Sequence, residues 1–196
     1  MKIYFLRHEH RNPNDVLFRS ELNAEGKALA SSLLKNFLNF LDIDEIYCSP
    51  FIRAMQTVTP YINEYKPGMK INVDYSIAER INHERFIPKE NQVFDLKEID
   101  YLRYPINRDY KSLLDHSVLF YKEEEMELIA RLKPFSDFIK QKYNHTNKNI
   151  LICSHMSTTN IMINCFYDTK RKMESDYEVG RVSTYDEIKK DVIFLN

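Results

Sequence analysis

Two short apolar runs of this sequence each lead directly into a histidine. Residues 3–6 lead into Arg7-His8, and residues 150–153 lead into Ser154-His155. A guanidinium group binds phosphate oxygens through paired hydrogen bonds and stays charged at physiological pH. A neutral imidazole beside that phosphate can attack phosphorus and carry the phosphoryl group covalently. These residue types therefore predict phosphoryl chemistry on an anionic substrate.

A third group of the same kind follows the apolar run at residues 45–48. The pair Ser49-Pro50 is a helix-start signal, which predicts a helix from about Pro50 to Tyr65 with Arg53 in its first turn. Functional groups of open α/β sheets gather just past the carboxyl ends of the strands. We therefore expect Arg53 near the two histidines. Taken singly, these residues have plainer interpretations: a polar strand end, a satisfied buried histidine or a surface arginine.

The remaining elements alternate between strand and helix. Asn23 is expected to cap a helix over residues 24–41, and further helices are expected from 122 and over 158–166. Strands are expected over residues 2–6, 45–48, 70–73, 149–153, 182–185 and 192–195. The stripe in the first helix is predicted to face the core; it comprises Leu29, Leu33, Leu34, Phe37, Leu38 and Leu41. This order predicts an α/β fold, a single three-layer α/β/α domain over residues 1–196 with a mostly parallel sheet.

Residues 80–121 follow no period that lasts. They contain several tyrosines, prolines and the arginines Arg85, Arg103 and Arg108. One interpretation is a partly helical insertion or cap over the functional edge of the sheet, in which the arginines contact a second anionic group of the substrate. The other is a surface insertion without a role.

Composition bounds the classes of function. The chain has 196 residues and a formal net charge of −1, which gives no electrostatic case for nucleic acid or a membrane surface as a partner. The first residues lack the features of a signal peptide, so we expect a cytoplasmic protein. The cysteines Cys48, Cys153 and Cys165 have no metal-ligand spacing, and we expect no metal and no cofactor.

The motifs resemble the histidine phosphatase (phosphoglycerate mutase-like) superfamily, in its short mutase-like branch. Leu6-Arg7-His8 with Asn14 downstream is similar to its opening motif, and residues 22–30 to the helix that follows. Residues 46–57 match almost throughout. Ile77-Ala78-Glu79 resembles the segment of the family's acid, residues 123–131 the start of a long helix, and residues 150–155 the strand of the second histidine.

The resemblance implies a role for each matched residue. His8 would be the nucleophile, and Glu79 would protonate the leaving oxygen, with Glu9, Glu84 and Glu90 as weaker candidates for that acid. The groups expected to bind the phosphoryl oxygens are Arg7, Arg11, Asn14, Arg53 and His155.

The sequence also departs from the family pattern. Glu9 and Met156 stand where the family carries glycine, so the Glu9 carboxylate is expected either to take a different backbone or to point away, onto Arg11. Arg11 and Pro13 also resemble the opening of the acid-phosphatase branch. A phosphatase acting through phosphohistidine is the leading hypothesis, on a small phosphorylated molecule or a phosphoprotein. A phosphoglycerate mutase and a non-catalytic phosphate-binding module are the alternatives, and the oligomeric state is not predicted.

Overall fold

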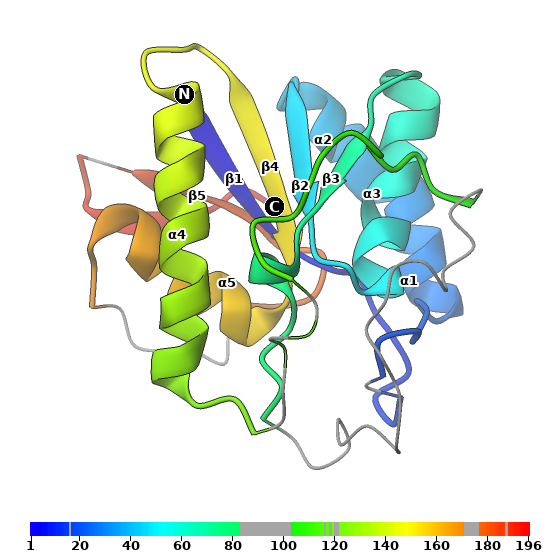
Figure 1. Cartoon of the computed structure of the whole chain (residues 1–196). Coiled ribbons are helices and arrows are strands. Elements are labelled where there is room, and N and C mark those ends of the chain that lie inside the picture. The colour runs from blue at the N-terminus through cyan, green and yellow to red at the C-terminus, as the bar shows by residue number, and fades with distance from the viewer. Residues whose placement is uncertain are drawn as a thin grey trace.

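The computed structural model describes residues 1–15, 17–82, 103–115, 117, 119, 122–170, 177–186 and 188–196. It shows a central sheet between two layers of helices (Figure 1). The strands are β1 (Lys2–Arg7), β2 (Glu45–Cys48), β3 (Ile71–Val73), β4 (Asn149–Ser154), β5 (Val182–Asp186) and β6 (Asp191–Phe194). The helices are α1 (Ala24–Leu29), α2 (Lys35–Phe40), α3 (Ile52–Tyr65), α4 (Glu125–Tyr143) and α5 (Met156–Tyr167), with a π-helical turn η1 (Ala30–Leu34) and a 3-10 turn η2 (Tyr75–Ile77).

The strand order β3-β2-β4-β1-β5-β6 places the motif-bearing strands side by side. The first four strands of this order are parallel, and β5 runs antiparallel to β1. In register, Arg7 lies opposite Ser154, and Cys48 lies opposite Cys153. Three parallel strands therefore end at one edge of the sheet, with the motif residues just beyond it. The predicted α/β class with a mostly parallel sheet is confirmed.

Each face of the sheet has its own core. On one face, β-strand residues such as Leu6 and Cys48 pack with Leu38 and Met55 from α2 and α3. On the other face, Phe5 packs with buried residues of α4 and α5, among them Leu128, Phe135, Ile161 and Phe166. Figure 1 shows α4 and α5 on one side of the sheet and α1, α2 and α3 on the other.

The predicted helix over residues 24–41 forms, but a π-helical turn divides it. Asn23 caps it as expected, since its Oδ1 accepts a hydrogen bond from Gly26 N at 2.8 Å. The turn η1 inserts wider i→i+5 bonding and rotates the residues that follow. Leu34 and Leu38 face the core, while Leu33, which lies within the turn, is 71 % exposed. The expectation that Leu33 is a core residue was wrong.

The first helix starts at Ala24 as predicted, and the other helix starts differ from the predictions by two or three residues. Helix α3 begins at Ile52 after Phe51, whose backbone N donates to Ser49 Oγ at 3.4 Å. Helix α4 begins at Glu125 after Glu124, which forms a capping box with Glu127. These shifts leave Arg53 in the first turn of α3, as predicted.

Part of the predicted insertion at residues 80–121 lies outside the described residues. Where the chain is described again, it runs beside β3: Ile71 N donates to Pro105 O at 2.8 Å, and Asn107 N donates to Ile71 O at 2.9 Å. Asp74 accepts hydrogen bonds from the Tyr110 hydroxyl at 2.5 Å and from Leu113 N at 3.0 Å. The second half of the insertion is thus anchored at the carboxyl end of β3.

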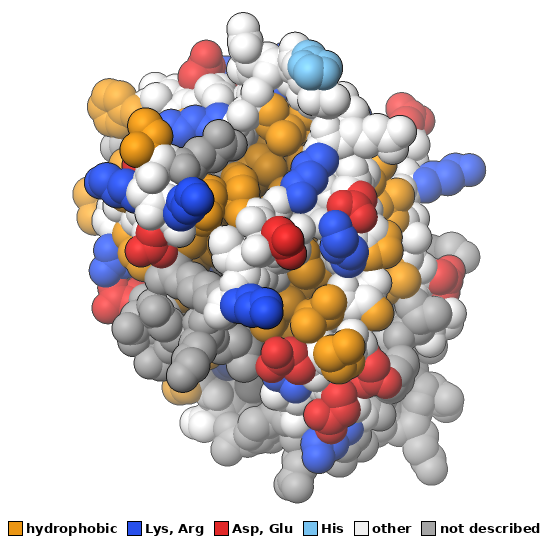
Figure 2. Space-filling model, turned by 90° about the vertical axis from the view of Figure 1, so that its left-hand side faces the viewer, with side chains coloured by type: hydrophobic (Ala, Val, Ile, Leu, Met, Phe, Trp, Pro, Cys, Tyr) orange, Lys and Arg blue, Asp and Glu red, His pale blue; other side chains and the backbone are white. Residues whose placement is uncertain are grey.

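The side of the molecule on the left of Figure 1 faces the viewer in Figure 2. Lysine and arginine are interspersed there with aspartate and glutamate, and apolar side chains show between them. A cavity of about 970 Å³ is lined by residues from α4 and α5, including Lys133, Lys140 and Cys165. Among the described residues, none of the helices is long and apolar enough to cross a membrane.

Candidate functional site

His8 lies immediately after β1, with only 2 % of its surface exposed. Its Nδ1 lies 2.7 Å from the carbonyl oxygen of Glu9, and because a carbonyl can only accept, Nδ1 carries the proton. Nε2 is left with its lone pair and accepts a hydrogen bond from Arg53 Nε at 3.3 Å. Burial, and then the charge of Arg53, hold the pKa of His8 well below its ordinary value. The imidazole is therefore neutral, and its lone pair lies on Nε2.

His155 follows β4 and meets His8 edge to face, with 5.0 Å between the ring centroids. Its Nε2 lies 2.7 Å from Ser49 Oγ, which belongs to the loop after β2. Phe51 packs on the same imidazole with its ring centroid at 4.9 Å. Burial, and then Arg53, hold the pKa of His155 well below its ordinary value. Residues after three strands thus converge on one pair of rings.

Arg53 joins the two histidines to the acid predicted from the sequence. Its guanidinium is fully buried, stacks over the Phe51 ring at 4.4 Å and donates to Leu17 O at 3.0 Å. It also forms a hydrogen-bonded ion pair with the Glu79 carboxylate. The same carboxylate oxygen of Glu79 lies 3.3 Å from His155 Nδ1. One carboxylate therefore contacts two of the groups that are expected to bind phosphate, Arg53 and His155.

The backbone that carries Glu79 is held by side chains from α4, β4 and α5. Ser154 Oγ donates to Ile77 O at 2.8 Å, and Thr158 Oγ1 donates to Ala78 O at 2.9 Å. Arg131 of α4 donates to the carbonyls of Ser76, Ala78 and Glu79 at 2.6, 3.0 and 3.2 Å. The segment of residues 77–79 is short and makes no hydrogen bonds of a β-sheet, so these side-chain bonds determine where Glu79 lies.

A buried ion pair holds Arg131 itself. Its Nε and one terminal nitrogen contact the two oxygens of Glu123 at 2.5 and 2.9 Å, the bidentate arrangement that suits a guanidinium. Glu123 Oε2 also accepts a hydrogen bond from Ile81 N at 3.3 Å. The pair therefore fixes the chain on both sides of Glu79.

Arg7 and Arg11 supply further positive charge. Arg7 donates to Tyr177 O at 2.6 Å, while its Nε is buried without a hydrogen-bond partner. Burial lowers the pKa of Arg7, and the nearby Glu79 opposes this shift. Arg11 donates to Asn12 O and Asp15 O at 2.9 and 3.0 Å. Its charge is close enough to contribute to the lowered pKa of His8.

Other predicted contacts lie apart or outside the described residues. Asn14 is exposed in a turn, where its backbone N donates to Asn12 Oδ1 at 3.0 Å. Arg103 and Arg108 are exposed. Arg85 and the alternative acids Glu84 and Glu90 lie outside the described residues. The roles given to Asn14 and to the arginines of residues 80–121 stay predictions.

Glu9 directs its carboxylate toward the segment that precedes β5. It packs against Gly180, where an added Cβ would lie 2.2 Å from Glu9 Oε1. Its backbone N donates to Thr57 Oγ1 at 3.0 Å, and Thr57 in turn donates to Arg53 O at 2.8 Å. The expectation that the carboxylate points away is met, but it lies against Gly180 rather than onto Arg11.

Sequence reasoning missed two residues of the site. Ser49 was interpreted as a helix cap, although its hydroxyl contacts His155, and Phe51 was given no role, although it packs on His155 and Arg53. Both lie within residues 46–57, the stretch with the fullest resemblance to the family, and that density of matches was the available signal.

Comparison with known proteins places this geometry in a family. The family model described as "Histidine phosphatase superfamily (branch 1)" matches residues 3–186. A Schizosaccharomyces pombe protein described as "Probable phosphatase C1687.21" is 27% identical over 175 residues, which cover 87% of this chain and 75% of that protein.

Solved phosphatase structures share the fold. The ecdysone phosphate phosphatase from Bombix mori superposes with a TM-score of 0.71 at 16% identity, over 97% of this chain and 91% of its own. The alpha-ribazole phosphatase from Shigella flexneri gives a TM-score of 0.63 at 18% identity, over 100% of this chain and 95% of its own. With the family model matched over nearly the whole sequence, the chain belongs to the histidine phosphatase superfamily.

Proposed function

We propose that this chain is a phosphatase that hydrolyses a phosphomonoester without a metal ion, through a phosphohistidine intermediate on His8. Membership of the family and the relatives described as phosphatases support phosphatase chemistry. One observation supports the mechanism most directly. The ring centroids of the buried, neutral His8 and His155 lie 5.0 Å apart, Arg53 contacts His8, and Glu79 contacts His155.

In the first half of the reaction, the phosphoryl oxygens replace the Glu79 carboxylate on Arg53 and His155. The lone pair of His8 Nε2 attacks phosphorus, and the bond from phosphorus to the leaving oxygen breaks. Released from Arg53, Glu79 takes up the proton of the substrate's phosphate monoanion and gives it to the leaving oxygen, so the alcohol leaves neutral. The charge of the transferring group spreads over its equatorial oxygens, where Arg7 and Arg53 can stabilise it.

In the second half, water attacks the phosphorus of phosphohistidine. Glu79 takes a proton from the water, the bond from phosphorus to Nε2 breaks, and inorganic phosphate is released. His8 returns to the neutral tautomer because Glu9 O still holds its Nδ1 proton. The acid of the first half is thus the base of the second, as microscopic reversibility requires.

The substrate is proposed to be a small phosphorylated molecule or a phosphorylated protein side chain. A phosphoglycerate mutase would use the same residues but would pass the phosphoryl group to a second hydroxyl instead of water. A phosphate-binding module would bind the anion without forming the nitrogen–phosphorus bond.

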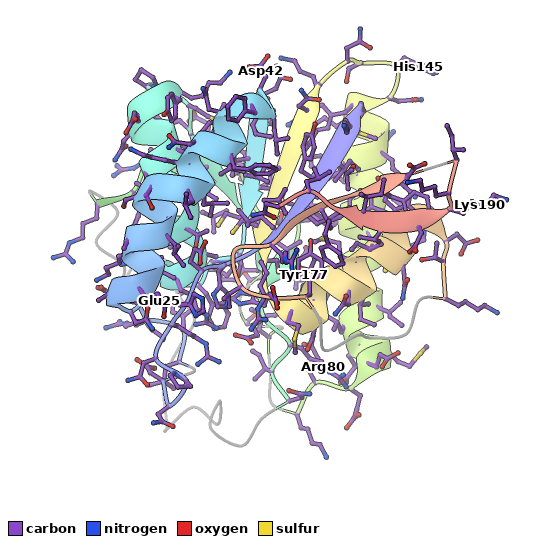
Figure 3. The ribbon with its side chains drawn as sticks, turned by 180° about the vertical axis from the view of Figure 1, so that it is seen from behind. Glu25, Asp42, Arg80, His145, Tyr177 and Lys190 are labelled. Atoms are coloured by element: carbon purple, nitrogen blue, oxygen red, sulfur yellow. The ribbon has the colours of Figure 1, made fainter. Side chains whose placement is uncertain are left out.

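The test is hydrolysis of an aryl phosphate by wild type, His8→Gln and the control His145→Asn. His145 occupies a turn with positive φ before β4, where asparagine is tolerated, at the end of the sheet away from the site (Figure 3). We expect activity and an acid-labile phosphoryl label on wild type and His145→Asn, and neither on His8→Gln. Activity in folded His8→Gln would refute the nucleophile. Phosphate binding without activity or label in wild type would favour the binding module, and label transfer to an acceptor alcohol would favour a mutase.

A further inference from the structure

Glu9 is a buried carboxylate that the phosphatase mechanism does not use through its side chain. The residue is 4 % exposed, and its backbone atoms alone contact the site, through His8 and Thr57. Gly180 makes room for the side chain: its φ of +67° favours glycine, and a methyl group there would collide with Oε1.

The second carboxylate oxygen of Glu9 lacks a hydrogen-bond partner. Oε2 is buried and unpaired, and burial raises the pKa of Glu9, opposed by His10 and reinforced by Glu25. Buried polar groups in folded proteins nearly always have a partner, and an unpaired buried carboxylate is costly. Oε2 is therefore an unsatisfied acceptor, and because it is covered in this conformation the side chain must turn for a ligand's donor to reach it.

Glu9 is one of the residues that line a pocket of about 550 Å³, and none of the catalytic groups proposed above is among them. One wall is the apolar side of the first helix, and the other is the segment that precedes β5. The apolar lining residues are Leu29, Leu33, Leu34, Phe37 and Val179. Figure 3 shows this face, with the helix that starts near Glu25 beside the segment that starts at Tyr177. Its size and its apolar walls with a few polar groups are typical of small-molecule sites.

The polar groups at the rim of the pocket are already paired with one another. Arg181 forms an ion pair with Glu178 at 2.8 Å and donates to Asn196 O at 2.6 Å. Asn196 Nδ2 donates to Gly180 O at 2.9 Å. Of the described lining residues, Glu9 is the one with a buried side-chain oxygen that lacks a hydrogen bond. Glu178 balances the charge of Arg181. The charge of Glu9 is therefore the one that we expect to determine which ligand binds.

We propose that this pocket binds a small aliphatic amine or guanidine, with its cationic end on the Glu9 carboxylate and its hydrocarbon body against the leucines and Phe37. A charge-assisted hydrogen bond would satisfy Oε2, and burial of the hydrocarbon adds a hydrophobic contribution. An anion would meet the carboxylate with like charge. A neutral hydrocarbon would leave Oε2 unpaired. The site does not depend on the proposed phosphatase activity.

The test is a titration of the full chain, followed by NMR, with hexylammonium chloride, 1-hexanol and ammonium chloride. We expect saturable binding of hexylammonium by wild type, weakened roughly tenfold or more in Glu9→Gln. Hexanol should bind more weakly, and equally to both proteins. Glu64→Gln makes the same change of charge at an exposed residue outside the lining and should leave hexylammonium binding unchanged.

A second variant keeps the proposal falsifiable if Glu9→Gln does not fold. Leu33 is exposed on the apolar wall, so Leu33→Lys places a cation in the pocket with little effect on stability. We expect it to weaken hexylammonium binding and to leave hexanol binding nearly unchanged. Equal hexylammonium affinity in all folded variants, or an absence of saturable binding by wild type, would overturn the proposal.

Discussion

The hydroxyl of Ser49 lies 2.7 Å from Nε2 of His155, although the two residues are 106 positions apart in the chain. This bond fixes the ring so that Nδ1 faces Glu79 at 3.3 Å. Ser49 lies just past β2 and His155 just past β4, and the two strands pair in register from Glu45 to Cys48. The orientation of the second histidine therefore depends on a strand pairing.

Replacement of Ser49 by alanine should lower kcat while the fold is retained. The substitution leaves a buried imidazole nitrogen without its partner, an effect of roughly 1–3 kcal/mol, so we expect kcat to fall roughly 5- to 150-fold. Steady-state kinetics with an aryl phosphate measure the loss. Ser32→Ala is the control, because that exposed hydroxyl bonds only its own helix, at Ala28 O. Unchanged kcat in Ser49→Ala would show that His155 needs no such support.

Replacement of Glu79 by glutamine should separate substrates by their leaving groups. A general acid contributes about 10²–10⁴ in rate, so hydrolysis of an alkyl phosphate should fall by that factor. Nitrophenolate leaves without a proton, so nitrophenyl phosphate should still give a burst of product in the first turnover. Stopped-flow measurement of both substrates checks this, with the exposed Glu64→Gln as control. Equal losses in the first turnover of both would contradict the acid role.

Stability should fall as the pH drops below the ordinary histidine pKa. His8 and His155 have a folded pKa well below the unfolded value of about 6.5, because burial and Arg53 disfavour the imidazolium. Below about pH 6.5 the unfolded chain binds protons that the folded chain does not, so the free energy of unfolding rises with pH up to that value and then levels.

Urea denaturation between acid and neutral pH measures this dependence. Each histidine adds a slope of up to about 1.4 kcal/mol per pH unit, so His8→Gln should remove about half of the pair's contribution. His145→Asn should keep the wild-type slope. Parallel curves for wild type and His8→Gln would show that His8 is protonated normally in the folded protein.

Replacement of Arg131 by methionine should destabilise the fold strongly. It leaves Glu123 buried without its partner and three backbone carbonyls without a donor, and such a loss is typically about 3–5 kcal/mol. Chemical denaturation should show this, and a second substitution, Glu123→Leu, should restore part of the stability because it removes the stranded charge. If the double variant is no more stable than Arg131→Met, the stability that Arg131 provides comes mainly from its hydrogen bonds to the backbone carbonyls and not from its ion pair with Glu123.

The arrangement of Glu79 shows where the sequence was insufficient. Ile77-Ala78-Glu79 indicated the acid by resemblance, but its place against Arg53 and His155 depends on Arg131, Ser154 and Thr158. These contacts span elements far apart in the chain. The local sequence around residues 77–79 therefore could not predict them.

The sequence by itself determined the strands, the helices and the residues that follow each strand, because apolar periodicity and cap residues act over a few positions. It therefore predicted His8, Arg53 and His155 at one sheet edge. The tertiary structure decided what depends on distant packing: the exposure of Leu33, the contact of Ser49 with His155, and the position of the Glu9 carboxylate against Gly180. Each of these features depends on which residues the sheet order and the helix packing bring into contact. Those contacts join residues far apart in the sequence, so they form only when the whole chain folds.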